Sequence, residues 1–249
     1  MSKNIIRLYC TVNLKELFLA QTDYALTSEQ NHYLIDVMRC KVGDELHLLD
    51  GKTGDYKCRI SSISKKKAFV TVLKLSKPPK DPADLWLLFA PVKKAGTELI
   101  IEKCVELGVK KIQPVITDYT NLPKINNKRF QNIMISSVQQ CGSTWLPELE
   151  ELKGLKKVLE SWDPERIIIF CDERLYGTKI NTLLQSIKSK PIAILIGPEG
   201  GFSDTEFDLL KGLKFVRRAS LGPQVLRAET AAIASISIWQ SICGVWSKS

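Results

Sequence analysis

The pattern of apolar and polar positions divides the chain into two parts. Before residue 77, short apolar stretches follow glycine turns at intervals of about ten residues, a pattern typical of a small β-barrel. The strands expected there are Ile5–Cys10, Glu45–Leu49, Tyr56–Ile63 and Ala68–Leu75. One helix is expected over Ser28–Met38, with Ser28 as its N-cap.

From Leu85 onward, apolar strands alternate with helical patterns, which indicates an α/β domain with a largely parallel sheet. The expected strands are Leu85–Ala90, Lys111–Ile116, Arg166–Cys171, Ile192–Ile196 and Phe215–Leu221. The expected helices are Thr97–Leu107, Lys128–Gln140, Thr178–Ile187, Asp204–Lys211 and Glu229–Ile242. Three prolines within residues 77–82 suit an extended linker. We therefore expect domains at 1–76 and 83–249, joined by the linker 77–82.

Glycine turns follow two of the late strands. Gly197-Pro-Glu-Gly-Gly201 comes after Ile192–Ile196, and the capping-box spacing of Ser203 and Glu206 predicts a helix that begins at Asp204. Gly222-Pro223 follows Leu221 and again leads into a helix. Because ligands favour the carboxyl ends of parallel strands, the two turns predict one pocket lined by backbone groups. Two tight structural turns would explain the same residues.

The distribution of charge adds a candidate partner. The chain of 249 residues has a formal net charge of +9, and residues 1–80 hold 14 Lys and Arg against 8 Asp and Glu. A basic domain is typical of nucleic-acid binding, although a solvated lysine-rich surface has the same composition. The candidate phosphate contacts are Arg7, Arg39, Lys65, Lys66 and Lys67.

Other features exclude classes of site. Seven scattered cysteines without Cys-x-x-Cys spacing, and only two histidines, argue against a metal site, so no metal is expected. No apolar run has the length of a membrane span and no signal-peptide core is present, so we expect a cytoplasmic protein with no membrane partner. The glycine turns lack the P-loop and Rossmann signatures. S-adenosylmethionine is favoured as the ligand by elimination only.

Several motifs resemble the RsmE family, whose members are methyltransferases of the SPOUT class that methylate N3 of a uridine in small-subunit ribosomal RNA. The motifs follow the family's order over most of the chain. They are His32-Tyr-Leu, Val37-Met-Arg-Cys-Lys-Val-Gly-Asp44, Ile101-Glu-Lys-Cys-Val-Glu-Leu-Gly-Val109, Leu195-Ile-Gly-Pro-Glu-Gly-Gly-Phe202 and Leu221-Gly-Pro-Gln-Val-Leu-Arg-Ala-Glu-Thr-Ala231.

This resemblance implies an N-terminal PUA-like β-barrel that binds RNA and a C-terminal SPOUT-type parallel sheet with a trefoil knot. It also implies a homodimer, 16S ribosomal RNA or the small ribosomal subunit as partner, and S-adenosylmethionine as methyl donor. Three loops of the knot would bind the donor, and on this sequence they are Phe170–Glu173, Ile196–Gly201 and Leu221–Leu226. The residues that the resemblance assigns to it are Phe170, Cys171, Ile196, Gly197, Glu199, Gly200, Gly201, Leu221, Gly222, Val225 and Leu226.

Two further residues are candidates for the chemistry of methyl transfer. A cation near the uracil oxygens would favour the anion that attacks the methyl group, and Arg227 directly follows the last loop. A structural ion pair of Arg227 with Glu229 or Glu199 is the alternative. Glu229 itself is either a base or a residue that stabilises a helix N-terminus.

The chain departs from the family at three positions where arginine is usual. Gln224, Ser143 and Tyr119 stand there instead, which puts the RNA contacts or the dimer surface in doubt. Two other functions stay open: a non-catalytic RNA-binding or ribosome-assembly factor, and a SPOUT methyltransferase that acts on another RNA base.

Overall fold

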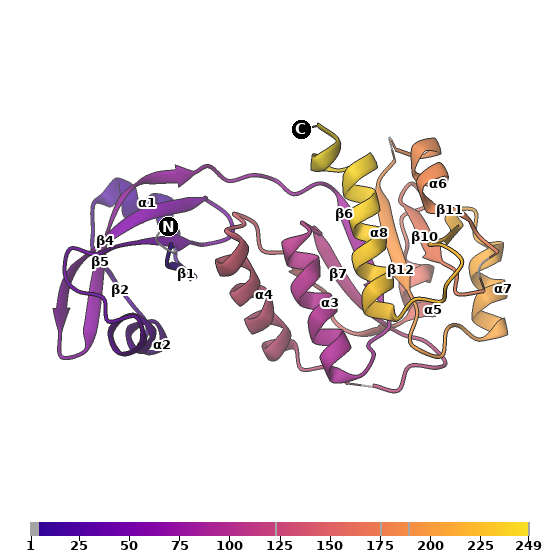
Figure 1. Ribbon diagram of the computed structural model, residues 1–249, viewed down its shortest axis with the longest axis horizontal. Helices are drawn as coiled ribbons and strands as arrows, with labels where there is room; N and C mark the ends of the chain where they lie inside the picture. The colour runs from indigo at the N-terminus through magenta and orange to yellow at the C-terminus, as the bar shows by residue number, and fades with distance from the viewer. Residues whose placement is uncertain (1–4, 123, 175, 189, 249) are drawn as a thin grey trace. The chain divides into compact units, whose positions relative to one another are not determined.

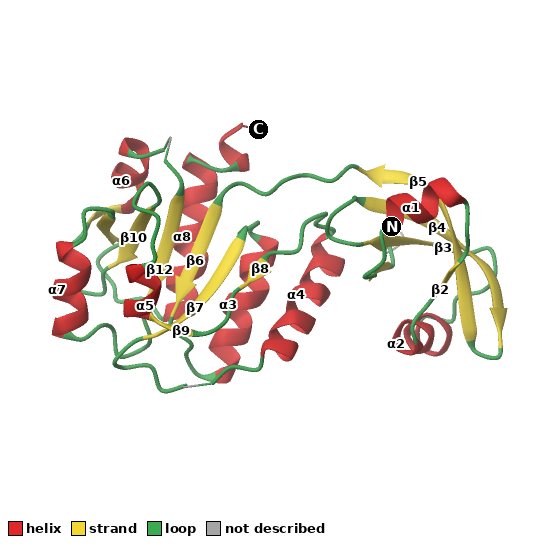
Figure 2. Cartoon of the chain, turned by 180° about the vertical axis from the view of Figure 1, so that it is seen from behind, coloured by secondary structure: helices red, strands yellow, loops and turns green. Residues whose placement is uncertain are grey.

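The computed structural model describes residues 5–122, 124–174, 176–188 and 190–248. The chain forms two compact units (Figures 1 and 2). Unit 1 comprises residues up to Asp81 together with Ile135–Leu146, and unit 2 comprises Pro82–Met134 and the chain from Pro147 onward. Residues 1–4 and 249, at the ends of the two expected domains, lie outside the described residues.

Unit 1 is built on a curled, mixed sheet with the strand order β1-β3-β4-β5-β2. Its strands are β1 (Arg7–Tyr9), β2 (Tyr24–Ala25), β3 (Glu45–Leu49), β4 (Asp55–Ser64) and β5 (Lys67–Lys77). β1 pairs with β3 in parallel, and the other pairs are antiparallel. The register of β4 against β5 shifts at several points, and such irregularities bend strands.

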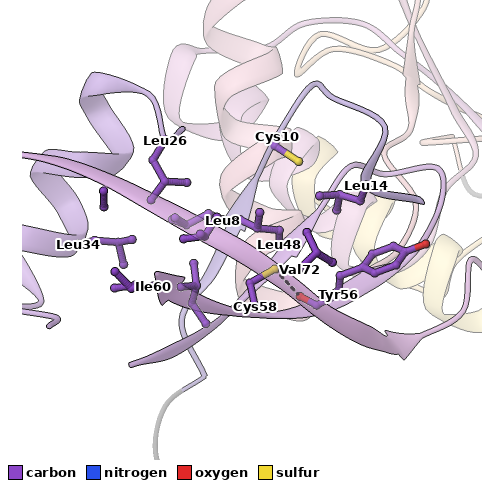
Figure 3. Packing of buried hydrophobic residues seen from close by; sticks show 13 residues of the cluster. Leu8, Cys10, Leu14, Leu26, Leu34, Leu48, Tyr56, Cys58, Ile60 and Val72 are labelled. Atoms are coloured by element: carbon purple, nitrogen blue, oxygen red, sulfur yellow. Dashed lines mark hydrogen bonds between the residues drawn. The ribbon is translucent and has the colours of Figure 1, made fainter. Parts of the chain in front are cut away.

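Alternate residues of the long strands supply the core of unit 1, as a period-two pattern predicts. These buried residues are Tyr56, Cys58 and Ile60 in β4 and Ala68, Val70 and Val72 in β5. Figure 3 shows several of them pointing toward Leu8, Leu34 and Leu48 from other parts of the unit. The four strands predicted in this part of the chain are confirmed.

Helix α1 (Leu14–Ala20) was not expected from the sequence. Leu14 is the residue of α1 that is buried, so the helix has no apolar stripe long enough to produce a helical period. The strand β2 was not predicted either, because two residues are too few to show an alternating pattern.

The helix expected over Ser28–Met38 is present in a different form. It consists of α2 (Ser28–Asn31) followed by the π-helical segment η1 (His32–Val37). The prediction of Ser28 as N-cap is wrong. Thr27 is the cap, because its side chain accepts from the Gln30 N–H while Gln30 Oε1 accepts from the Thr27 N–H, which completes a capping box.

Unit 2 contains a parallel sheet with the strand order β11-β13-β10-β12-β6-β7-β8, and β9 pairs with the far end of β7. Its strands are β6 (Leu85–Phe89), β7 (Lys111–Ile116), β8 (Glu148–Leu149), β9 (Lys153–Gly154), β10 (Ile167–Cys171), β11 (Thr178–Lys179), β12 (Ile192–Ile196) and β13 (Val216–Ser220). All residues of β10 and β12 are buried, as a strand covered on both faces requires. The five strands predicted here are confirmed to within a residue or two.

Helices cover both faces of this sheet. They are α3 (Lys94–Glu106), α5 (Leu155–Glu160), α6 (Ile180–Ser186), α7 (Asp204–Gly212) and α8 (Ala228–Ile242), followed by the 3-10 segment η2 (Val245–Lys248). Helix α4 (Asn127–Cys141) begins in unit 2, and its residues from Ile135 onward belong to unit 1. α5 and α7 pack on one face in a cluster that includes Leu88, Phe170 and Ala193. α3 and α8 lie together on the other face, in front of the strands in Figure 1 and behind them in Figure 2.

Because of the strand order, the chain crosses the position of β10 twice after it leaves β12. β10 lies between β12 and β13 in the sheet, although β12 and β13 follow each other in the chain. The segment after β12 therefore crosses the end of β10 and continues through α7 to β13. The segment 221–227 then returns to α8, which contacts β12 on the opposite face from α7.

Replacing the observed N-cap should destabilise unit 1 more than replacing the residue beside it. Thr27→Ala removes a side-chain acceptor for a helical N–H, so we expect it to lower the free energy of unfolding by about 1 kcal/mol. Ser28→Ala is the matched control and should change it by less than about 0.5 kcal/mol, since surface substitutions away from caps have small effects. Chemical denaturation of both variants measures the difference, and an equal effect at the two positions would contradict the cap assignment.

Candidate functional site

The functional site lies at the carboxyl ends of three neighbouring strands. β12, β10 and β13 are adjacent and parallel, so the loops that follow them meet at one edge of the sheet. These loops enclose a cavity of about 310 Å³. Its lining consists of Cys171, Asp172, Glu173, Ile196, Gly197, Pro198, Glu199, Gly200, Gly201, Leu221, Gln224, Val225, Leu226, Arg227, Ala228 and Ala231.

The middle loop has a conformation that depends on its glycines. Gly201 has a φ of +70°, where a side chain is strained, and its N–H donates to the carbonyl of Pro198 at 2.9 Å. A Cβ on Gly197 would lie 2.6 Å from the ring of Phe202, a residue only 3% exposed. The predicted capping box of Ser203 and Glu206 is confirmed and begins α7 immediately after this turn.

The first loop holds both backbone polar groups of Phe202. Glu173 Oε1 accepts from the Phe202 N–H at 3.2 Å, and the Arg174 guanidinium donates to the Phe202 carbonyl at 3.4 Å. Arg174 also pairs with Asp204 at 2.8 Å, at the start of α7. Glu173 and Gly201 both line the cavity, so these bonds fix the distance between its first and second walls.

A buried carboxylate attaches the same loop to β13. The side chain of Asp172 is fully buried and accepts from the Arg218 guanidinium at 2.6 Å, while its other oxygen accepts from the Arg174 N–H at 2.9 Å. The guanidinium groups of Arg174 and Arg218 lie over the ring of Phe207 at 4.2 and 4.7 Å. Because a buried charge is costly without a partner, this network keeps Asp172 in one position.

The third loop is less enclosed. Gly222 has a φ of +132°, and its N–H donates to Ser220 Oγ at 3.4 Å. Val225 is 69% exposed and Gln224 is also exposed, although both line the cavity. This loop therefore forms the open side of the cavity.

The positively charged guanidinium of Arg227 lies at the rim of the cavity. It is exposed and lines the cavity, and within the described residues its guanidinium makes no ion pair. The alternative of a structural pair with Glu199 or Glu229 is not observed. Glu199 instead accepts from the backbone N–H of Lys93 at 3.3 Å.

Glu229 lies in the first turn of α8 and is not part of the lining. Its carboxylate is 3.3 Å from the position that a Cβ would take on Gly96, in the first turn of α3. Negative charge stabilises the N-terminus of a helix. This position suits the structural alternative for Glu229 better than the role of a base.

Most of the predicted ligand residues come together at this cavity. Ten of the candidates line it, while Phe170 is buried beneath it and Gly222 and Glu229 lie beside the lining. Asp172, Glu173, Pro198, Gln224, Ala228 and Ala231 also line it but were not assigned from the sequence. The first four lie in the three loops that the family resemblance assigns to the donor, whereas the two alanines give no sequence signal beyond their place at the start of a helix.

The candidate phosphate contacts of unit 1 differ among themselves. Arg39, Lys65, Lys66 and Lys67 are exposed. Arg7 is not: its side chain is 16% exposed and pairs at 3.4 Å with Asp55, whose side chain is fully buried and also bonds His47. Arg7 therefore neutralises a buried carboxylate, which leaves little of its guanidinium for a phosphate.

Two kinds of feature are absent from the described residues. No group of three or more metal-ligating side chains is present there, and no helix in that part of the chain has the length and apolarity to cross a membrane.

Known proteins resemble both parts of the chain. Residues 79–240 match the RNA methyltransferase domain family, and residues 26–73 match the RNA methyltransferase PUA domain family. Similar structures include a methyltransferase from Legionella pneumophila with bound SAM, at 28% identity and a TM-score of 0.81, covering 96% of this chain and 98% of that one. Another is ribosomal RNA small subunit methyltransferase E from Neisseria gonorrhoeae bound to S-adenosyl methionine, at 25% identity and a TM-score of 0.84, covering 97% and 99%.

Sequence relatives lead to the same assignment. Ribosomal RNA small subunit methyltransferase E of Rickettsia conorii is 31% identical over 83% of this chain and 84% of its own length. The enzyme of that name from Synechocystis is 31% identical over 95% of this chain and 78% of its own length.

The fold and the site thus define a SPOUT-class RNA methyltransferase with a PUA-like domain, and the predicted fold class is confirmed. Within that class, the chain belongs to the ribosomal RNA small subunit methyltransferase E family.

The cysteine in the cavity should be chemically inert. Burial raises the pKa of the Cys171 thiol to about 12, and the thiolate is the form that reacts with alkylating agents. Iodoacetamide at pH 8 should therefore leave Cys171 unmodified in the native protein while it modifies the exposed Cys141. Peptide mass spectrometry measures both, and modification of Cys171 as fast as Cys141 would contradict the burial of this wall.

Proposed function

We propose that this protein transfers a methyl group from S-adenosylmethionine to N3 of a uridine in small-subunit (16S) ribosomal RNA. The observation that carries the proposal is the cavity formed by the three loops after β10, β12 and β13. Support comes from relatives that bear the name of this activity and from similar structures that hold S-adenosylmethionine. The proposal includes the small ribosomal subunit as the source of the RNA and a homodimer as the working form.

The residues of the cavity fit a methyl donor that carries a nucleoside. Its walls are largely apolar, with Ile196, Leu221, Leu226 and the two alanines of α8. The glycine turn leaves backbone N–H and carbonyl groups accessible, and such groups fix the orientation of a ligand in an apolar pocket. We assign the donor to this lining together with Gly222 and the underlying Phe170.

The bound donor supplies an electrophilic methyl group on a sulfonium. The chain must hold the uridine in line with that group, and such positioning lowers the barrier by several kcal/mol. Removal of the N3 proton leaves negative charge on the uracil oxygens. We assign its stabilisation to Arg227, because the guanidinium is at the rim of the cavity and has no partner among the described residues. Glu229 is the less suitable candidate for a proton acceptor.

We assign the contacts to RNA phosphates to Arg39, Lys65, Lys66 and Lys67 in unit 1. The two-residue turn between β4 and β5 consists of Lys65 and Lys66, with φ values of +47° and +61°. Asparagine and glycine are the residues that favour this conformation, and strained positions are found preferentially at functional sites. Arg39 also has a positive φ, of +54°. A stability optimum would not place three long cationic side chains in this conformation.

The direct test supplies the purified protein with S-adenosylmethionine and with small-subunit rRNA or subunits from a strain that lacks the enzyme. We expect calorimetric binding of the donor, and 3-methyluridine as the new nucleoside in mass spectrometry of the digested RNA. Failure to bind the donor would favour a non-catalytic RNA-binding or assembly factor. Methylation of a different nucleoside would favour a SPOUT methyltransferase with another target base.

Arg227→Ala should separate donor binding from chemistry. We expect at least about a tenfold loss of kcat, since a group that stabilises developing charge contributes this much or more, with the dissociation constant for the donor nearly unchanged. Arg217→Ala is the matched control, because Arg217 is an exposed arginine of β13 that bonds backbone carbonyls and does not line the cavity. An unchanged rate in Arg227→Ala would make Arg227 a residue without a catalytic role.

A further inference from the structure

Tyr119 lies directly on the glycine turn of the cavity. Its Cβ is 3.3 Å, and two atoms of its ring are 3.7 Å, from the position that a Cβ would take on Gly200. Gly200 lines the cavity, so the tyrosine adjoins one of its walls. A side chain at position 200 would be in direct contact with the tyrosine, which would have to shift slightly to admit it.

Hydrogen bonds hold the backbone around this tyrosine in place. The Thr117 N–H donates to Thr120 Oγ1 at 2.9 Å, and the Thr120 N–H donates to the carbonyl of Thr117 at 3.0 Å, which closes a turn around residue 119. The Asp118 N–H donates to Glu206 Oε1 at 3.0 Å, and the Asp118 carboxylate accepts from Ser203 Oγ. The turn that carries Tyr119 is thus attached to the capping box that follows the glycine turn.

The aromatic ring is not needed for the core of unit 2. Tyr119 is 50% exposed, and its hydroxyl forms no hydrogen bond with any described residue. An exposed ring on a rigid turn is a surface on which a nucleobase can stack at little cost in conformational entropy. Arginine planes stack on bases as aromatic rings do, which explains how a tyrosine could stand where the family resemblance leads us to expect arginine.

We propose that Tyr119 stacks on a nucleobase of the RNA substrate beside the donor cavity and thereby helps to hold the target uridine outside its base stack. This inference rests on the proposed function, because it requires an RNA substrate at the cavity. An extruded base loses its stacking partners in the RNA, and an aromatic face replaces part of that loss. Tyr119 is in this role a substrate-binding residue without a part in proton transfer.

Three variants distinguish stacking from simple packing. Tyr119→Phe keeps the aromatic face and the contact with Gly200, Tyr119→Leu keeps an apolar side chain without the face, and Tyr119→Ala removes both. Steady-state methylation of unmodified small-subunit rRNA gives KM for the RNA and kcat, and calorimetry gives the dissociation constant for S-adenosylmethionine. We expect Tyr119→Phe to behave as wild type, and both other variants to raise KM for the RNA about tenfold with donor binding unchanged.

Other results would contradict either the stacking role of Tyr119 or the proposed function. A wild-type KM in Tyr119→Ala, or in Tyr119→Leu, would overturn the stacking role while the wild-type enzyme still methylates RNA. Weaker donor binding in Tyr119→Ala would also overturn it, since the residue would then support the donor pocket. Absence of methylation by the wild-type protein would instead contradict the proposed function.

Discussion

The site at the carboxyl edge of the sheet in unit 2 depends on the hydrogen bonds between one loop and the backbone of Phe202. Glu173 and Arg174 bond the two polar groups of that residue, and Asp172, next to them, binds Arg218 of β13. The ring of Phe202 in turn fills the space above Gly197 and meets Phe170 edge-on, with 4.9 Å between ring centroids. One short segment therefore connects the ends of all three strands. Because the side chain of Asp172 is fully buried, loss of Arg218 would leave an uncompensated charge beside the cavity.

The charged groups around the cavity differ in whether their side chains have bonding partners. Asp172, Arg218 and Arg174 are bound to one another or to the backbone, and Glu199 is bonded to Lys93. Arg227 differs from the other charged lining residues, because within the described residues its side chain forms neither an ion pair nor a hydrogen bond. A group fixed in a network shapes a site, whereas a group left without a partner is available to the substrate. This difference could not be read from the sequence, in which all these residues appear equally charged.

Local sequence patterns predicted the helices and strands, but they did not predict which elements and residues are neighbours in space. β3, β7 and β12 have the expected bounds because uniform or alternating apolar runs reflect burial directly. The capping box at Ser203 was predicted because its two residues are close in the sequence. Thr27 and Gln30 have the same spacing, but the prediction placed the N-cap at Ser28. The order of β13, β10 and β12 and the partner of Arg7 depend on contacts between distant residues, and no periodicity encodes them. The position of Tyr119 could not be predicted for the same reason, because its contact with Gly200 joins residues that are about eighty positions apart in the sequence.

The passage of the chain around β10 has a consequence for how the enzyme matures in the cell. Leu221–Ala231 form the last wall of the cavity, and they follow every other lining residue in the order of synthesis. The ribosome releases this segment after β10 and β12, so the donor pocket cannot exist on any nascent chain that ends before α8. A prematurely terminated chain would lack a place for the methyl donor. Synthesis order thus makes the donor pocket the last part of the site to be completed.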